Sequence, residues 1–370
     1  MDIEEESNDS GVRRLAFTKG ILYGRDQELE QLQSLFGQCL SSSHKTSSSE
    51  IVFVHGVAGT GKSQLAAKFR EEKESKCYFI DGKYDEGSHA KPFSAITAAI
   101  TKLCDEVLYP RKRHCESSAK EPSDLGIGQR IFKALGCTEG KLLLDMIPKL
   151  KEIIRIDAQK QHESQTPGSS DGSARVFLQG TASAYRVTFL FQRLLKSIAT
   201  KKKPLVLFLD DLQWADQASL RLLHLVLTDA TLKNVMFLGS YRENEVDSSH
   251  PLYREVLSKL QDQNVVYSNI ALGNLKLNDV QSIVADTLDM PGNLVYDLAE
   301  AIYNKTHGNV FYAKLQCRLW PTSQSLNTHM SPTDGLGTWI ESRTRWSFRI
   351  MWFRSSSHGL EACRKHSNRP

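Results

Sequence analysis

The sequence lacks any apolar stretch of 18 residues, which is about the length that a membrane-crossing helix requires. Its amino terminus, MDIEEESNDS, is acidic and polar, whereas a secretory signal peptide begins with basic residues and continues with apolar ones. We therefore expect an intracellular, cytoplasmic protein that has no membrane partner.

Close pairs of cysteine are also missing. The chain has seven cysteines, an odd number, at positions 39, 77, 104, 115, 137, 317 and 363. This spacing argues against a zinc ribbon, and the odd count argues against a disulfide framework. The simplest interpretation is a set of buried or inert thiols in a reducing compartment.

A strong excess of one charge is absent from most of the chain. The formal net charge is +4, and residues 316–370 alone hold eight Lys or Arg against three Asp or Glu. The first 315 residues are therefore nearly neutral and give no sign of the basic surface that nucleic-acid binding requires. With 370 residues, of which 24% are charged and 40% hydrophobic, the chain has the length of about two globular domains.

A glycine-rich turn follows the first strongly apolar run, in IVFVHGVAGTGKSQLAAKF (residues 51–69). The run 51–54 predicts a strand buried on both faces, and a helical pattern starts at the lysine. Between them, one segment fits the G-x-x-x-x-G-K-[ST] pattern of a phosphate loop, or Walker A motif. Its residues are Gly56, Val57, Ala58, Gly59, Thr60, Gly61, Lys62 and Ser63.

The spacing of this loop explains how it would hold a nucleotide. Glycines let the backbone turn so that successive N–H groups face a phosphate, and the helix N-terminus adds partial positive charge. Lys62 would reach the β and γ phosphates, and the Ser63 hydroxyl would ligate Mg²⁺. We predict phosphate binding here in preference to an accidental glycine turn before a helix.

Apolar runs alternate with helical patterns along the chain. This order predicts an α/β P-loop fold, with a parallel sheet of about five strands covered by helices on both faces. The expected strands are residues 51–54, 77–85, 204–211, 234–246 and 265–272. The clearest expected helices are residues 26–36 with Asp26 as N-cap, 92–107, 141–154 and 183–199.

Four segments are expected. Residues 1–19 form a disordered N-terminus, and residues 20–272 form the P-loop ATPase domain, which contains an insertion or loop at about 156–183. Residues 273–316 form a small helical lid, and Asn278 caps its first helix. The tail, residues 317–370, holds four of the five tryptophans and has no sustained periodicity. We interpret it as a truncated or altered end of a longer chain, with a real peripheral segment as the alternative.

A pair of carboxylates ends the strand of residues 204–211, in KPLVLFLDDLQWAD. A hydrophobic strand that ends in acid is the form of a Walker B motif. Asp210 would then hold Mg²⁺ directly or through water, and Asp211 stands where many such ATPases place the carboxylate that polarises the attacking water. The alternative is a buried strand that ends in a solvated Asp-Asp turn.

Several motifs occur together, in the order GRDQELEQL, the phosphate loop, YFIDGKYDEGSHAKPFSAI, DDLQWAD, GSYRENEV and KTHGNVFY. In this combination the chain resembles the ATPase domain of the STAND class of signal-transduction proteins, in its origin-recognition-like AAA subgroup. The resemblance covers about residues 20–315. Such domains occur in large multidomain signalling kinases, in nucleotide cyclases and in some transcriptional regulators.

The resemblance also implies roles for residues outside the phosphate loop. It makes Arg242 the sensor that feels the γ-phosphate, although an ion pair of Arg242 with Glu243 or Glu245 is an alternative. Relatives commonly have proline where this chain has Val310 in the lid. The segment expected to lie against the adenine comprises Tyr23, Gly24 and Arg25.

These features favour a slow regulatory ATPase switch that binds ATP or ADP with Mg²⁺. Nucleotide would set the angle between sheet domain and lid, and so control an effector domain, a protein partner or a nucleotide-dependent homo-oligomer. Three alternatives stay open. They are an origin-recognition-type DNA-binding ATPase, which would need a basic winged-helix domain after the lid, a small-molecule phosphotransferase, and a non-hydrolysing scaffold.

Overall fold

The computed structural model describes residues 20–40, 49–87, 92–109, 126–136, 140–159 and 181–319. Contacts within the chain divide it into two compact units. The larger comprises Gln27–Ala58 and Lys62–Leu272, and the smaller comprises, among the described residues, 20–26, Gly59–Gly61 and 273–319. Each unit has its own cluster of buried apolar side chains.

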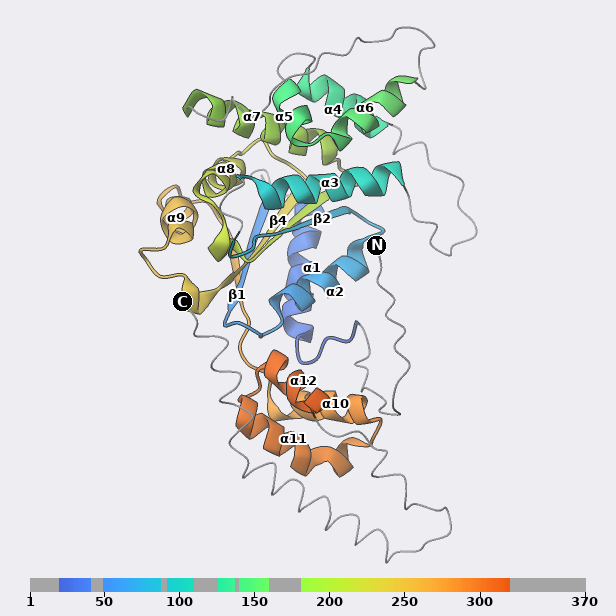
Figure 1. Ribbon diagram of the computed structural model, residues 1–370, viewed down its shortest axis with the longest axis vertical. Helices are drawn as coiled ribbons and strands as arrows, with labels where there is room; N and C mark the ends of the chain where they lie inside the picture. The colour runs from blue at the N-terminus through green and yellow to red at the C-terminus, as the bar shows by residue number, and fades with distance from the viewer. Residues whose placement is uncertain are drawn as a thin grey trace, which may run out of the picture. The chain divides into compact units, whose positions relative to one another are not determined.

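The larger unit is built on a five-stranded parallel sheet, with the strand order β2-β3-β4-β1-β5 (Figure 1). The strands are β1 (Glu50–Gly56), β2 (Tyr78–Lys83), β3 (Leu205–Asp210), β4 (Val235–Arg242) and β5 (Ser268–Ala271). This sheet confirms the predicted α/β P-loop fold. Because β1 and β3 both pair with β4, the phosphate loop and the Asp-Asp pair follow strands that end at the same edge of the sheet.

Helices cover both faces of this sheet. On one face, Phe69 of α2 makes edge contacts with Phe36 of α1 and with Phe79 of β2. On the other face, α3 packs on β2, and α6 packs on α3 in a further layer that includes α4 and α7 (Figure 1). The helices are α1 (Asp26–Leu40), α2 (Lys62–Lys73), α3 (Ser94–Leu108), α4 (Ile127–Leu135), α5 (Lys141–Met146), α6 (Lys149–Gln159), α7 (Thr181–Ile198), α8 (Gln217–Leu227) and α9 (Ser258–Asp262).

The strands are apolar on both faces because both faces are covered. Every residue of β3 is buried, and the odd-numbered residues Leu205, Leu207 and Leu209 belong to the core that packs under α3. Their even-numbered neighbour Phe208 faces the other way and contacts Phe79. This composition fits a strand that is covered on both faces, and β3 lies between β2 and β4.

Several predicted boundaries differ from the observed ones. The helix predicted over residues 141–154 is two helices, α5 and α6, because Pro148 disfavours helical backbone at the residue before it. The loop expected at 156–183 is helical at both ends, since α6 continues to Gln159 and α7 begins at Thr181. The rest of that loop, and the N-terminus 1–19, lie outside the described residues.

The described part of the smaller unit contains three helices, α10 (Leu277–Leu288), α11 (Gly292–Thr306) and α12 (Val310–Leu319). The prediction that Asn278 caps the first of them is wrong. Lys276 is the N-cap residue, and its N–H donates to the carboxylate of Asp279 at 3.0 Å. The tail was expected to be irregular from residue 317, but α12 extends to Leu319, and the rest of the tail lies outside the described residues.

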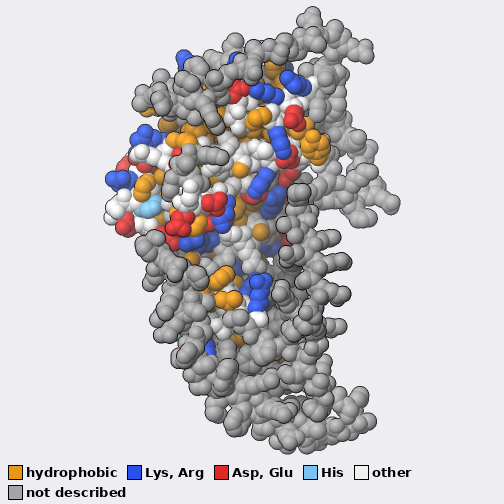
Figure 2. Space-filling view, in the orientation of Figure 1, with side chains coloured by type: hydrophobic (Ala, Val, Ile, Leu, Met, Phe, Trp, Pro, Cys, Tyr) orange, Lys and Arg blue, Asp and Glu red, His pale blue; other side chains and the backbone are white. Residues whose placement is uncertain are grey.

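Among the described helices, none combines the length and the apolar composition of a membrane-spanning segment. On the face of the larger unit seen in Figure 2, acidic and basic side chains lie close to one another among apolar ones. The described surface in this view therefore has no extended region of one charge.

Candidate nucleotide-binding site

The phosphate loop connects β1 to α2. Gly56 and Gly61, the two glycines that the motif requires, have φ angles of 148° and 96°, values that favour glycine. The loop ends at Lys62, the first residue of α2, so the N–H groups at the start of this helix face the loop. The structure therefore has the strand, loop and helix that the motif requires.

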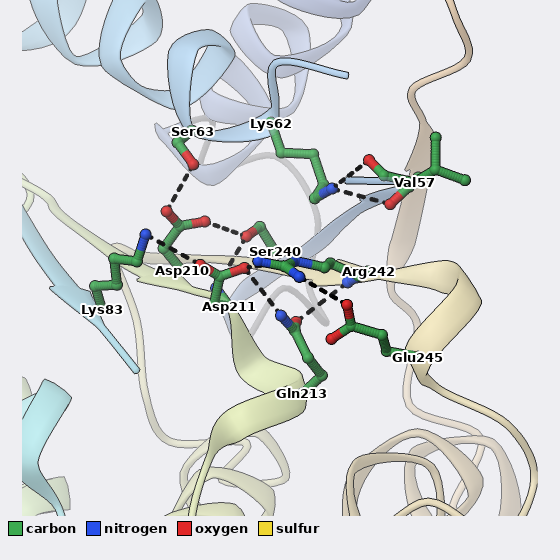
Figure 3. A network of polar contacts seen from close by, with 11 residues as sticks. Val57, Lys62, Ser63, Lys83, Asp210, Asp211, Gln213, Ser240, Arg242 and Glu245 are labelled. Atoms are coloured by element: carbon green, nitrogen blue, oxygen red, sulfur yellow. Dashed lines mark hydrogen bonds and ion pairs between the residues drawn. The ribbon is translucent and has the colours of Figure 1, made fainter. Parts of the chain in front are cut away.

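The ammonium group of Lys62 lies against the loop itself. Its Nζ donates to the carbonyls of Gly56 and Val57, each at 2.9 Å, and the residue is only 7% exposed (Figure 3). Burial lowers the pKa of this lysine, and the nearby carboxylates of Asp211 and Asp210 oppose that shift. A buried cation whose partners are backbone carbonyls gains a stronger partner when an anionic phosphate enters the loop.

The carboxylate of Asp210 lies at the end of β3 and is held from two sides. The hydroxyl of Ser63 donates to its Oδ2 at 2.7 Å, and the hydroxyl of Ser240 on β4 donates to its Oδ1. The two predicted magnesium ligands, Ser63 and Asp210, are thus in direct contact. The contact of Ser240 with Asp210 follows from the register of β3 on β4, which pairs Leu209 with Gly239, next to Ser240.

These oxygens fit Mg²⁺. Magnesium binds hard oxygen ligands and keeps several waters, so it is commonly held by one or two protein groups together with substrate phosphates. Among the described residues, no group of three or more His, Cys, Asp or Glu side chains could hold a metal ion without other ligands. Ser63 and Asp210 would hold Mg²⁺ in this way, and the bound ion would neutralise charge on the phosphates.

Asp211 has left-handed backbone geometry, with φ 56°, and its N–H donates to the Ser240 hydroxyl at 3.2 Å. Both of its carboxylate oxygens have partners. Oδ2 lies 3.1 Å from Nζ of Lys83, and Oδ1 accepts from Nε2 of Gln213 at 2.9 Å and lies 3.6 Å from Nε of Arg242. The predicted water-polarising carboxylate is therefore neutralised and oriented by its neighbours.

The Lys83 ammonium at the end of β2 lies beside this acidic edge because Lys83 pairs with Asp210 in the sheet. Partial burial by itself would lower the pKa of Lys83. The hydrogen bond to Asp211 and the charges of Asp211 and Asp210 outweigh burial and raise that pKa. Lys83 therefore remains a cation throughout the physiological pH range.

Arg242 ends β4, where it pairs with Gly56 of the phosphate-loop strand. Its guanidinium contacts Asp211, donates from Nη1 to Glu245 at 2.7 Å, and stacks 4.4 Å from the ring centroid of Trp214. The ion pair considered as an alternative thus exists alongside the contact with Asp211. Glu243, the other acid considered, is 3.2 Å from Nδ1 of His55 instead.

The residues expected near the adenine lie in the smaller unit. Tyr23 donates its hydroxyl to Asp286 at 2.8 Å, and Arg25, which is 5% exposed, donates to the carbonyl of Thr60 at 3.1 Å and to that of Gly273. Gly24 has φ 59°, and a Cβ there would meet the Asp279 carboxylate at 2.4 Å. This segment is therefore fixed by its own polar contacts.

The tip of the phosphate loop belongs to the smaller unit as well. The N–H of Phe311 donates to the carbonyl of Gly59 at 3.1 Å, and a Cβ on Gly59 would lie 2.5 Å from Oδ1 of Asn309. The Asn309 carboxamide also accepts from the N–H groups of Phe311 and Tyr312 at the start of α12. The GNVFY segment thus packs on this tip.

Three residues of the site were missed by the sequence reasoning: Lys83, Gln213 and Ser240. All three lie within the quoted motifs, at or beside strand ends. Their position near strand ends could have identified them from the sequence, because polar residues at the carboxyl ends of neighbouring parallel strands meet at one edge of the sheet.

A family model described as the AAA ATPase domain matches residues 21–238. The chain is also 24% identical, over 361 residues, to the hybrid signal transduction histidine kinase G of Dictyostelium discoideum. That match covers 80% of the chain and 9% of the kinase, so the chain spans a small part of this relative.

Among solved structures, the fold is similar to that of Cdc6p from Pyrobaculum aerophilum, with 13% identity and a TM-score of 0.43 over 82% of this chain and 61% of that one. It is also similar to the ADP form of ORC2 from Aeropyrum pernix, with 11% identity and a TM-score of 0.42 over 81% and 62% of the two chains. The Walker-type ATPase PABY2304 of Pyrococcus abyssi is a third similar structure, with 11% identity and a TM-score of 0.40 over 96% of this chain and 79% of that one.

Proposed function

Since the chain belongs to the AAA ATPase domain family, we propose that it binds ATP or ADP with Mg²⁺ and hydrolyses ATP slowly, as a nucleotide-dependent switch in signal transduction. The observation that carries the proposal is the contact between Ser63 and Asp210, 2.7 Å apart beside the buried Lys62. A nucleoside triphosphate with Mg²⁺ requires a residue that binds phosphate and a residue that binds magnesium, and both must lie at one edge of the sheet.

Each predicted site residue has a proposed role. Gly56–Ser63 holds the phosphates, Ser63 and Asp210 hold the metal, and Asp211 polarises the attacking water. Arg242 senses the γ-phosphate from its position opposite Gly56. Tyr23, Gly24 and Arg25 provide backbone and side chain near the base. We also propose residues 20–272 as the ATPase domain and 273–316 as its lid.

Slow turnover is expected from the state of Asp211. Lys83, Gln213 and Arg242 all contact its carboxylate, so a water molecule can hydrogen-bond to these oxygens only when one of the partners moves away. Hydrolysis would then require these cations to shift toward the γ-phosphate. Such an enzyme resides in each nucleotide state for a long time, which suits a switch.

The signalling role is supported by the relative, a hybrid signal transduction histidine kinase of which this chain matches a small part. We propose a cytoplasmic module that acts on an attached effector, a protein partner or a second copy of itself. The near-neutral charge balance of the first 315 residues disfavours a nucleic-acid partner, since a DNA-binding ATPase would carry an excess of basic residues.

Nucleotide binding to the full chain tests the proposal. The wild type should bind ADP and ATP in the presence of Mg²⁺, measured by calorimetry, and should release phosphate from ATP. Lys62→Ala removes a charge-assisted contact that water cannot replace and should lower the affinity at least tenfold. Lys68→Ala is the matched control, because Lys68 lies on the same helix and pairs with Glu71 on the surface.

Equal affinity of the wild type and Lys62→Ala would overturn the nucleotide site. Binding without any phosphate release, in the wild type, would instead favour a non-hydrolysing scaffold.

A further inference from the structure

The short 3-10 turn Leu212–Trp214 follows directly after Asp211 and lies beside the end of β4. Its side chains contact two of the residues discussed above. Gln213 is buried, with 6% of its surface exposed, although glutamine is ordinarily a surface residue. A buried carboxamide requires partners for both its oxygen and its nitrogen, and these partners identify its role.

The carboxamide of Gln213 joins two strand ends. Its Nε2 donates to Oδ1 of Asp211 at 2.9 Å, and its Oε1 accepts from the backbone N–H of Arg242 at 3.2 Å (Figure 3). The two partners fix the orientation of the amide, because the carboxylate can only accept and the backbone N–H can only donate. The end of β3 is thus tied to the end of β4 through one side chain.

The next residue of the turn acts on the same arginine. The guanidinium of Arg242 lies 4.4 Å from the ring centroid of Trp214, within the range of a cation–π contact. Gln213 therefore fixes the backbone of Arg242 and the carboxylate of Asp211, while Trp214 supports the guanidinium. These contacts together restrict how far the two functional groups can move apart.

The backbone conformation of Asp211 is one reason why its carboxylate needs contacts that hold it in place. Asp211 has left-handed geometry at φ 56°, which is less favourable for a residue with a Cβ than ordinary backbone, although aspartate tolerates it better than most residues. The Ser240 hydroxyl holds its N–H, and the Gln213 amide holds its side chain. Without the amide, the carboxylate would be free to follow Lys83 toward solvent, because 56% of the Lys83 side chain is exposed.

We propose that Gln213 and Trp214 are positioning residues that hold Asp211 and Arg242 in the geometry required for γ-phosphate recognition and water attack. The inference rests on the proposed function, since it assigns those tasks to Asp211 and Arg242. It goes beyond that function in assigning a role to two residues that bind neither nucleotide nor metal.

Two pairs of variants test the inference in the full chain. Gln213→Glu keeps the size of the side chain but places a carboxylate against Asp211, and Gln213→Leu keeps its bulk without either hydrogen bond. Trp214→Leu removes the ring, whereas Trp214→Phe retains an aromatic face. Gln261→Leu is the control, because Gln261 is an exposed glutamine in the same unit that donates to Tyr267.

Affinity for ADP should stay within about twofold of the wild type in all five variants, because no phosphate ligand is changed. The turnover number should fall about tenfold to a hundredfold in both Gln213 variants and in Trp214→Leu, as expected for a misplaced catalytic group. Trp214→Phe should recover most of the loss, and Gln261→Leu should match the wild type. The KM for ATP should change less than the turnover number.

The ratio of the dissociation constants for ADP and ATP provides a second measurement, which needs no hydrolysis. If Gln213 and Trp214 position Arg242, the preference for ATP should decline in Gln213→Leu and Trp214→Leu and return in Trp214→Phe. An unchanged ratio together with an unchanged turnover number would overturn the inference while leaving nucleotide binding intact. Loss of ADP binding in Lys62→Ala, measured in parallel, tests the proposed function separately.

Discussion

The hydroxyl of Ser63, at the start of α2, lies 2.7 Å from Oδ2 of Asp210, at the end of β3. The two residues are far apart in the sequence, and each comes from a different motif. Their contact gives the two motifs a common location, at which a hard cation could bind. Substitutions at this location therefore test the chemistry expected of both motifs.

Replacement of Asp210 by asparagine should weaken the dependence on magnesium. A neutral amide is a poor substitute for a hard anionic ligand, so the magnesium concentration needed for half-maximal ATP binding should rise about tenfold or more. A magnesium titration of nucleotide binding measures this shift. Asp262→Asn, an exposed position at the end of α9, should leave the titration unchanged. If Asp210→Asn also leaves it unchanged, the metal site lies elsewhere.

Replacement of Asp211 by asparagine should separate binding from hydrolysis. The amide keeps the size of the side chain but cannot polarise a water molecule as a base, so phosphate release should fall by about 10² to 10⁴, whereas the affinity for ADP should change little. Steady-state phosphate release and calorimetry measure the two quantities. Asp211→Glu retains a carboxylate and should keep more activity than Asp211→Asn. Equal turnover of the wild type and Asp211→Asn would exclude Asp211 as the base.

Local patterns were sufficient to predict the sheet. The residues of β1, β3 and β4 are apolar on both faces, and their short length and β-branched or aromatic content favoured buried parallel strands over helices. The phosphate loop was equally predictable, because its glycines and lysine must occur at a fixed spacing between a strand and a helix.

The helices α4 and α8 were missed for different reasons. α4 is strongly amphipathic but occurs in a region of irregular composition, and α8 follows the acidic motif directly. For α8 a signal existed, because Asp216 caps the helix and its side chain accepts from the N–H of Ser219. The predicted cap at Asn278 failed because Asp279, one residue later, holds the N–H of Lys276 instead.

Side-chain partners across the sheet could not be predicted from spacing. The contact of Lys83 with Asp211 depends on the pairing of β2 with β3, and that of Ser240 with Asp210 depends on the pairing of β3 with β4. A sequence shows which residues end a strand, but the order of the strands decides which ends are neighbours. The partners of Asp211 therefore required the structure.

A pH-dependent stability is expected from His250. Its Nδ1 accepts from the N–H of Leu252 at 3.1 Å, so the ring must be neutral at that nitrogen, and burial lowers the pKa of His250. Because the unfolded chain then binds more protons, the stabilisation is complete above the unfolded pKa of about 6.5 and is lost as the pH falls through the folded pKa. One such group changes the free energy of unfolding by at most about 1.4 kcal/mol per pH unit.

His250→Asn tests this expectation. Asparagine places an acceptor oxygen close to the position of Nδ1 and does not titrate, so denaturant unfolding between pH 5 and 7.5 should show a shallower loss of stability than in the wild type. His307→Asn is the control, since His307 is exposed and asparagine tolerates its left-handed backbone, with φ 50°. An identical pH dependence of His250→Asn and the wild type would show that His250 does not titrate in this range.

Removal of residues 320–370 should leave nucleotide binding unchanged. Every candidate ligand precedes the end of α12 at Leu319, and the described helices of the smaller unit already share an apolar core of their own. Solubility should improve, because the removed segment carries aromatic residues without the periodicity that would bury them on a helix or strand face: Trp320, Trp339, Trp346, Phe348, Trp352 and Phe353. Calorimetry with ADP and static light scattering compare the shortened and full chains. If the shortened chain unfolds, or loses nucleotide that the full chain holds, these residues belong to the fold, and the interpretation of the tail as a truncated or altered end is wrong.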